Sequence, residues 1–205
     1  MPSEISAREE IKLYFDYKSP FAYLAVEPAL ALPSRYRVDL RWMPFQLRIK
    51  GKGQRSVYSE WKVRYSYMDA RRHANRRGGF TIRGPRKVYD STPGLIGALF
   101  AQRHGFFPAY TREVFRRFFE HRLELDEAQE IAALVGELEG DPDAYLEWQA
   151  GEGSAALEAC IEEAHQDNVF GVPIFVLRDE LFWGHDRIPL LEERLTEYAL
   201  ANPAP

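Results

Sequence analysis

Alternating apolar and polar residues near the start of the chain predict two strands. Ile11–Asp16 alternates and is rich in aromatic and β-branched side chains, and Val38–Trp42 alternates in the same way. Between them, Ser19 is a good helix N-cap and Pro20 a good first helical residue, so a helix is expected to run to about Leu32. Together these segments make a β-α-β unit, with its connecting helix on one face of a sheet.

The middle of the chain has the apolar spacing of helices. Helices are expected over Tyr58–Arg77, Gly94–His104 and Tyr110–Leu123, from an N-cap at Asp126 to Gly140, from Asp141 onward, and over Ser154–His165. One of them carries an apolar stripe of helical period, made of Tyr110, Val114, Phe115, Phe118 and Phe119. A block of helices therefore follows the β-α-β unit.

The last part of the chain returns to strands. Gly171–Leu177 and Leu181–Trp183 are apolar runs separated by a short polar turn, which predicts an antiparallel hairpin. Asp186 can cap a final helix. The fold class is therefore α/β, a thioredoxin-like fold with a helical insertion between its β-α-β and β-β-α halves. We expect residues 10–50 and 166–200 to form the thioredoxin-like domain and residues 51–165 the helical insertion domain.

Composition supports an ordinary globular protein. The 205 residues are 45% hydrophobic and 28% charged, which excludes disordered and collagen-like classes. Cys160 is the only cysteine, so no intrachain disulfide or Cys-x-x-Cys pair can form, and buried packing is its favoured role. No apolar run approaches the roughly 20 residues of a membrane span. Met1–Glu10 does not resemble a secretory signal, so a cytoplasmic protein without a membrane partner is expected.

Charge is distributed unevenly along the chain. Lys50–Lys87 holds twelve Lys or Arg and two acids, whereas Glu120–His165 holds fourteen acids and one base. A basic stretch can attract nucleic acid, a membrane surface or a small anion. Alternatively, the two stretches face each other within the fold or in a dimer. No stacking aromatic motif of a nucleic-acid module accompanies the basic stretch, so no nucleic-acid partner is expected.

Three short motifs carry a family resemblance. The segments Asp16–Tyr23, Phe170–Pro173 and Phe182–Arg187 lie, in this order, at the end of the first strand, before the third strand and before the last helix. With them the chain, from about Ile11 to Leu195, resembles the 2-hydroxychromene-2-carboxylate isomerase family. That family is related to kappa-class glutathione transferases within the DsbA-like group.

The resemblance implies glutathione as cofactor and assigns residues to it. Ser19 stands where a thioredoxin-type oxidoreductase has its attacking cysteine, so disulfide exchange by that route is excluded. A cis peptide is implied at Val172-Pro173, with the Val172 backbone pairing with the cysteinyl part of glutathione. The γ-glutamyl end would be held by Trp183, Gly184, His185 and Asp186. His185 departs from the family, which commonly has a small polar residue there.

Energetics favour Ser19 as a hydrogen-bond donor to the glutathione thiolate. Lowering a thiol pKa from about 8.5 to about 6.5 requires roughly 2.7 kcal/mol. A hydrogen bond to a charged group supplies about 1.5–3 kcal/mol, and a helix N-terminus adds about 0.3–1 kcal/mol. No catalytic base is needed, and the glycines of a nucleophile elbow are absent. Simpler interpretations remain: Ser19 only caps a helix, Pro173 opens an edge strand, and Asp186 caps a helix with Trp183 in the core.

Substrate residues follow from the resemblance as well. The isomerases act on aromatic carboxylates, and Lys50 and Tyr89 match substrate-contacting positions. Tyr58 and Ser59 stand where the family has an asparagine–arginine pair, which weakens the specific chromene assignment. The resemblance further implies a homodimer. No tight histidine or carboxylate spacing for a metal ion is present.

The sequence thus favours a glutathione-dependent isomerase of an aromatic oxo-acid, acting by reversible thiolate addition to an activated double bond. Two alternatives remain open. One is a kappa-type glutathione transferase that releases a conjugate. The other is a non-catalytic glutathione- or anion-binding protein of the same fold.

Overall fold

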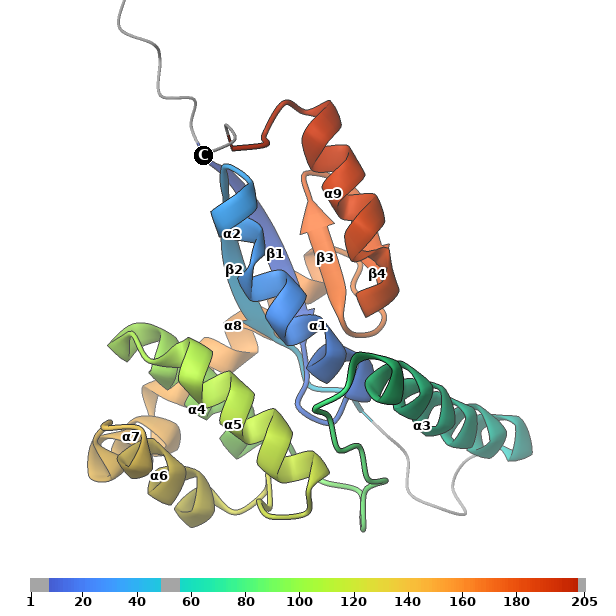
Figure 1. Cartoon of the computed structure of the whole chain (residues 1–205). Helices are drawn as coiled ribbons and strands as arrows, with labels where there is room; N and C mark the ends of the chain where they lie inside the picture. Colours follow the sequence, from blue (N-terminus) through green and yellow to red (C-terminus); the bar gives the residue numbers. More distant parts are fainter. Residues whose placement is uncertain (1–7, 49–55, 203–205) are drawn as a thin grey trace, which may run out of the picture.

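A four-stranded mixed sheet forms the centre of the fold (Figure 1). The computed structural model describes residues 8–48 and 56–202, apart from the side chains of Val57 and Tyr58. The strands are β1 (Glu9–Phe15), β2 (Val38–Pro44), β3 (Ile174–Leu177) and β4 (Glu180–Trp183), in the spatial order β2-β1-β3-β4. β1 is parallel to β2 and antiparallel to β3, and β3 and β4 form the expected hairpin. The thioredoxin-like fold is confirmed.

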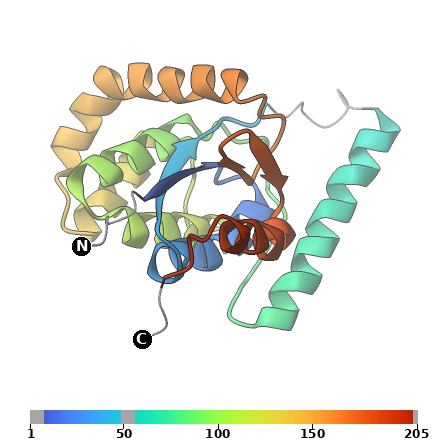
Figure 2. The ribbon, with the colours of Figure 1, turned by 90° about the horizontal axis from the view of Figure 1, so that it is seen from above.

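Helix α1 (Pro20–Leu30) begins where the sequence predicts. Ser19 is its N-cap and accepts a hydrogen bond from the Ala22 N–H, and Pro20 occupies the first turn. The helix ends slightly earlier than expected, because a separate short helix, α2 (Leu32–Arg35), follows it. Pro28 lies inside α1. Figure 2 shows α1 and the last helix, α9 (Ile188–Glu197), on one side of the sheet and α8 (Glu152–Gln166) on the other.

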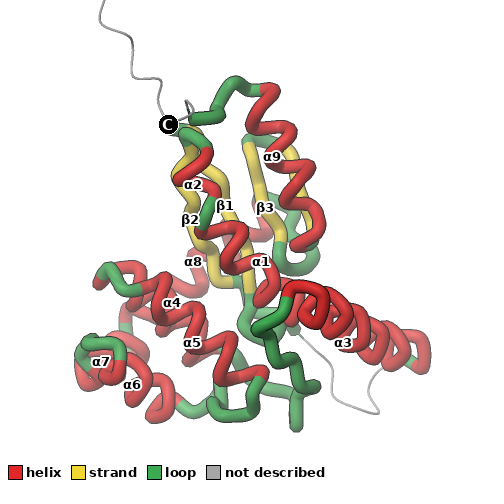
Figure 3. The backbone as a smooth tube through the Cα atoms, viewed as in Figure 1, coloured by secondary structure: helices red, strands yellow, loops and turns green. Residues whose placement is uncertain are grey.

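Helices occupy the chain between β2 and β3 (Figure 3). They are α3 (Val57–Arg77), α4 (Thr92–His104), α5 (Phe107–Phe119), α6 (Ala128–Glu137), α7 (Pro142–Ala150) and α8 (Glu152–Gln166). Asp141 caps α7 as expected, accepting from the N–H groups of Asp143 and Ala144. The prediction of an Asp126 cap is wrong, because Glu127 precedes α6 and makes no side-chain cap.

Aromatic side chains join the helices to the sheet. The predicted stripe of α5 is buried in full. Within it, the rings of Phe115 and Phe119 stack on Tyr23 of α1, with centroids 5.4 and 5.6 Å away. Phe15 at the end of β1 meets Tyr17 edge to face at 5.3 Å. These contacts fix α1, and with it Ser19, against the end of β1.

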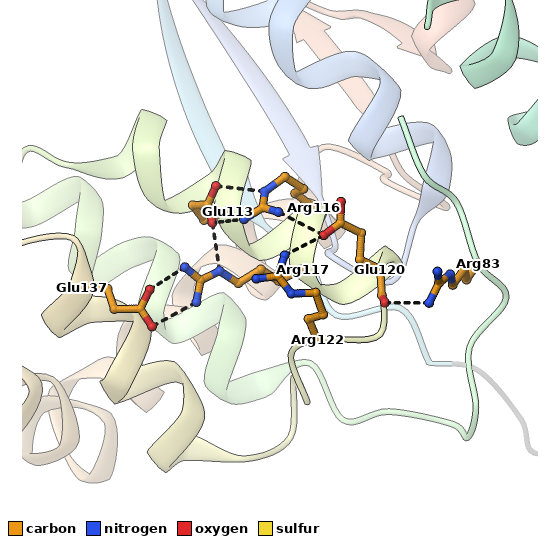
Figure 4. A network of polar contacts seen from close by, with 7 residues as sticks. All are labelled: Arg83, Glu113, Arg116, Arg117, Glu120, Arg122 and Glu137. Atoms are coloured by element: carbon orange, nitrogen blue, oxygen red, sulfur yellow. Dashed lines mark hydrogen bonds and ion pairs between the residues drawn. The ribbon is translucent and has the colours of Figure 1, made fainter. Parts of the chain in front are cut away.

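Charged residues on α5 form an ion-pair network (Figure 4). Arg117 pairs with Glu113 at 2.8 Å and with Glu137 of α6 at 2.5 Å, and Arg116 pairs with Glu113 and Glu120. Hydrogen bonds from Arg116 and Arg117 hold the pKa of Glu113 at about 2. The network therefore joins α5 to α6 over the pH range in which these carboxylates stay ionised.

The basic and acidic stretches meet at one place within the fold. Lys87 pairs with Asp126 at 2.9 Å and with Glu124 at 3.3 Å, and Arg86 lies 3.8 Å from Glu124. For these residues, the interpretation that the two stretches face each other within the fold is confirmed. Cys160 is buried, and burial raises its pKa to about 11, as expected for a packing role. Within residues 8–48 and 56–202, no helix has the length and apolar character of a membrane span.

Candidate functional site

A cleft of about 550 Å³ opens at the N-terminal end of α1. Its walls come from the start of α1, from α3, from the segment before α4, and from the segments on either side of the β3–β4 hairpin. Eight of the predicted site residues line it: Ser19, Tyr89, Val172, Pro173, Trp183, Gly184, His185 and Asp186. Segments more than 150 residues apart in sequence thus meet around one cavity.

Ser19 is buried at the base of this cleft and makes two hydrogen bonds. Its Oγ accepts from the Ala22 N–H at 3.2 Å and donates to the Val172 carbonyl at 3.2 Å. The backbone N–H of Ser19 donates to the Asp16 carbonyl. Pro20 in the first turn has no N–H. The N–H of Phe21 donates to no described residue, so it is the donor of this turn that stays open to a ligand. A hydroxyl and one backbone N–H are therefore available to an anion here.

The peptide bond between Val172 and Pro173 is cis, as the resemblance implies. The Val172 carbonyl accepts from Ser19, whereas the Val172 N–H makes no hydrogen bond with any described residue. Directly after β4, the Gly184 N–H donates to the Pro173 carbonyl at 2.9 Å. The Val172 N–H is thus an open backbone donor in the wall of the cleft.

Gly184 makes the turn after β4 and requires glycine. Its φ is +117°, and a Cβ there would lie 2.4 Å from Oδ1 of Asp186. The expectation that Asp186 caps the last helix is wrong: it lies in a 3₁₀ turn, His185–Arg187, and Arg187 occupies the N-cap position of α9 without a side-chain cap. The Asp186 carboxylate instead pairs with Arg187 at 2.8 Å and stays half-exposed.

His185 lies between three elements and is only 4% exposed. Its ring stacks on Phe21 of α1, 5.4 Å away, and meets His73 of α3 edge to face at 4.6 Å. Neither ring nitrogen has a hydrogen-bond partner among the described residues. Burial, together with the nearby His73 and Arg77, lowers the pKa of His185 to about 4. The imidazole is therefore neutral at pH 7.

Sequence analysis missed a buried ion pair beside Ser19. The carboxylate of Asp16 is fully buried and accepts from Lys18 N, Leu47 N and Ser91 Oγ, and the Lys18 ammonium lies 3.4 Å away. Lys18 also donates to the carbonyls of Leu47 and Tyr89. Burial raises the pKa of Asp16, and Lys18 and the three donors oppose that effect. Through these hydrogen bonds, the Asp16–Lys18 pair connects the turn that carries Ser19 to Leu47 and Tyr89, which also line the cleft.

Part of the cleft wall is apolar. Tyr65, Pro85, Val88, Tyr89 and Phe118 belong to it. Tyr89 meets Phe118 edge to face at 5.1 Å, and its hydroxyl donates to Glu124 at 3.3 Å. Burial and Glu124 raise the pKa of the Tyr89 hydroxyl. These side chains suit a flat apolar group.

The other predicted substrate residues do not join this cleft. Lys50 lies outside the described residues. Tyr58 lies in the first turn of α3, and its side chain is likewise outside the described part. Ser59 is exposed, and its hydroxyl is 3.0 Å from that of Ser56. Lys62, one turn further along α3, does line the cleft and makes no ion pair with a described residue.

Comparison with known proteins gives one consistent result. The family model of the DSBA-like thioredoxin domain matches residues 10–196. A 2-hydroxychromene-2-carboxylate isomerase from Pseudomonas putida is 30% identical over 203 residues, which cover 94% of this chain and 97% of that protein.

Solved structures agree with that match. A 2-hydroxychromene-2-carboxylate isomerase structure superposes with a TM-score of 0.77 at 24% identity, covering 93% of this chain and 96% of that one. The cytosolic disulfide reductase DsbM from Pseudomonas aeruginosa, in a structure with GSH, superposes with a TM-score of 0.61 at 20% identity. That match covers 91% of this chain and 99% of the reductase.

Proposed function

The chain belongs to the 2-hydroxychromene-2-carboxylate isomerase family of DSBA-like thioredoxin domains, and on this premise we propose that it is a glutathione-dependent isomerase of an aromatic oxo-acid. One observation carries the proposal. The Ser19 hydroxyl lies 3.2 Å from the carbonyl of Val172, inside a cleft that also holds the Gly184–Asp186 turn. All three motifs therefore meet at one cavity.

The open polar groups of the cleft fit glutathione. Its cysteinyl backbone can pair with the Val172 N–H, which has no partner among the described residues. The N–H groups of His185 and Asp186, equally open among those residues, suit the γ-glutamyl carboxylate, and the half-exposed Asp186 suits the γ-glutamyl ammonium. Half-exposed Trp183 lies beside this turn. A structural neighbour with GSH shares the fold.

When bound, glutathione would supply a thiol that adds reversibly to an activated double bond, so that the bond can rotate. Ser19 would stabilise the ionised thiol by turning its hydroxyl from the Val172 carbonyl toward the sulfur, aided by the Phe21 N–H. Asp16 and Lys18 would hold the turn that carries Ser19. None of these residues needs to accept or release a proton.

The apolar wall of the cleft would bind the aromatic part of the substrate. Tyr89 and Phe118 offer ring contacts, and Lys62 offers a cation for a carboxylate. Lys50, Tyr58 and Ser59 remain candidates from the resemblance alone.

Disulfide exchange is the main competing activity within this fold, and the residues argue against it. Ser19 replaces the attacking cysteine, and Cys160 is buried with a raised pKa. A kappa-type transferase and a non-catalytic glutathione-binding protein remain the alternatives, because the same cleft would serve both. A cytoplasmic location is part of the proposal, since the chemistry uses a reduced thiol.

The test is an isomerisation assay with 2-hydroxychromene-2-carboxylate, with and without glutathione. The proposal predicts interconversion only when glutathione is present, and recovery of all the glutathione at the end. A stable conjugate would indicate a transferase. Glutathione binding without turnover would indicate a binding protein. Turnover without glutathione would refute the proposal that glutathione is the cofactor.

A further inference from the structure

The imidazole of His185 is a buried titratable group that the proposed mechanism does not use. Neither Nδ1 nor Nε2 has a hydrogen-bond partner among the described residues, although both atoms are buried. Buried polar atoms in native proteins are nearly always hydrogen-bonded, so two unpartnered nitrogens on one ring point to a function or a ligand. The family resemblance supplies no role for this side chain, because a small polar residue commonly stands at its position.

The ring lies directly behind the wall of the cleft. From α1, Phe21 stacks on it, and from α3, His73 meets it edge to face, and both of these residues line the cleft. The titratable and charged groups that face the ring come from α3 and from its own turn, and they are His73, Arg77, Asp69 and Asp186. Asp186 is paired with Arg187, and Asp69 lies 3.7 Å from Nε2 of His73. Both carboxylates thus face other partners, and neither is bound to a nitrogen of His185.

These surroundings keep the ring neutral at pH 7. Burial favours the neutral imidazole, and His73 and Arg77 act in the same direction, so the pKa of His185 is lowered to about 4. Asp186 and Asp69 oppose this effect without reversing it. A further negative charge close to the ring would favour the imidazolium instead.

The backbone of the same turn offers a place for such a charge. The N–H groups of His185 and Asp186 donate to no described residue, and both residues line the cleft. A carboxylate that accepts from the His185 N–H lies about 3 Å from that nitrogen, and the ring is attached to the same residue only three bonds further along. The ligand charge and the ring are therefore coupled electrostatically at short range.

We propose that the Gly184–Asp186 turn binds a ligand carboxylate and that the buried His185 ring takes up one proton from solvent when it does. The imidazolium formed in this way pairs with the bound carboxylate. The inference rests on the proposed function, under which the ligand is glutathione and the carboxylate belongs to its γ-glutamyl residue. The ammonium of that residue faces the Asp186 carboxylate, which balances its charge.

The coupling makes binding depend on pH. An opposite charge at this range raises a pKa by about one to three units, so His185 should titrate at about 5–7 in the complex. Because the complex then holds the proton more tightly than the free chain, affinity rises as the pH falls toward about 4. For a rise of two units, the dissociation constant should be about tenfold lower at pH 5 than at pH 7. Ionisation of a thiol at Ser19 has the opposite pH dependence, so cofactor binding and thiolate formation together define a pH window.

Calorimetric titration of the full chain with S-methylglutathione tests the proposal. The methylated sulfur cannot ionise, so no thiol proton enters the measurement. At pH 5, the heats of binding in acetate and in MES buffer are compared, and their difference gives the number of protons taken up, because the two buffers have different ionisation enthalpies. We expect about 0.4–0.9 proton per bound ligand in the unchanged chain. S-methylcysteinylglycine, which lacks the γ-glutamyl residue, should bind without this uptake.

Two variants assign the proton. His185→Gln removes the titratable ring, so proton uptake should fall below about 0.1 per ligand and the tenfold change in affinity should disappear. His165→Gln is the matched control, because His165 is exposed on α8 and does not line the cleft, and its uptake should equal that of the unchanged chain. Equal uptake in His185→Gln and the unchanged chain would overturn the proposal and leave the proposed function intact. Absence of S-methylglutathione binding at both pH 5 and pH 7 would overturn both.

Nuclear magnetic resonance of the unchanged chain supplies a measurement that needs no variant. The His185 ring protons can be assigned through their contact with Phe21, and they should titrate with a midpoint of about 4 in the free chain. Saturating S-methylglutathione should raise that midpoint by about one to three units. A midpoint that stays the same in the complex would contradict the proposal, whether or not His185→Gln folds.

Discussion

Replacing Ser19 by alanine separates its structural role from its proposed chemical role. The hydroxyl makes two contacts, one with the Ala22 N–H and one with the Val172 carbonyl, each at 3.2 Å. Loss of an N-cap costs about 1 kcal/mol of folding free energy, within a range of roughly 0.5–2 kcal/mol. Ser19→Ala should therefore unfold at a lower urea concentration but remain folded.

The chemical effect of the same substitution is larger. A hydrogen bond to a charged group is worth about 1.5–3 kcal/mol, which corresponds to roughly one to two pKa units. The pKa of the bound glutathione thiol should rise by that amount in Ser19→Ala. Ultraviolet absorbance of the thiolate, followed while the pH is varied, measures the shift directly. The isomerisation rate near neutral pH should fall together with the ionised fraction.

Ser56→Ala is the matched control. Ser56 is the N-cap of α3 and accepts from the Ser59 N–H, as Ser19 does in α1. Its loss should destabilise the protein by a similar amount without changing the thiol pKa. If Ser19→Ala leaves the thiol pKa within a few tenths of a unit of the unchanged protein, Ser19 is only a helix cap and the reasoning is refuted.

Three further substitutions test the surroundings of the site. Gly184→Ala forces an L side chain to a φ of +117° and brings its Cβ to 2.4 Å from Asp186, so we expect a loss of about 1–3 kcal/mol in urea denaturation; an unchanged midpoint would contradict this. Asp16→Asn leaves the Lys18 ammonium buried without its counter-charge and should lower the free energy of unfolding by about 3–5 kcal/mol. Adding Lys18→Met should recover part of that loss. Equal stability of the single and double variants would argue against a contribution of the ion pair. The lowered pKa of His185 means that the unfolded chain binds a proton more readily, so its contribution to stability is complete above pH 6.5 and is lost as the pH falls toward about 4. His185→Gln should flatten the stability profile in that window, and an identical slope would show that other groups cause it.

The order of the helices and strands was predictable from the sequence because the residues that begin and end helices act through their own backbone and side-chain preferences. Ser19 and Pro20 open α1 through their own backbone and hydroxyl preferences, and Asp141 caps α7 in the same way. Asp126 is also an aspartate shortly before a helix, but it does not cap that helix. Its carboxylate is bound at 2.9 Å to Lys87, which is far away in sequence, so a tertiary ion pair took precedence.

The least predictable features of the site depend on packing between distant segments. A lysine such as Lys18 is normally exposed, and its burial follows from carbonyls at Leu47 and Tyr89 that only the folded chain brings near. His185 is buried because α1 and α3 pack against the turn that carries it. The motif positions were predictable, whereas the environment of each side chain was not.

The position of the bound sulfur tests the account most directly. A crystal structure of the protein with glutathione should place the sulfur within hydrogen-bond distance of Ser19 Oγ, with the cysteinyl backbone paired to Val172. Glutathione bound elsewhere, or in the cleft with its sulfur turned away from Ser19, would contradict the account.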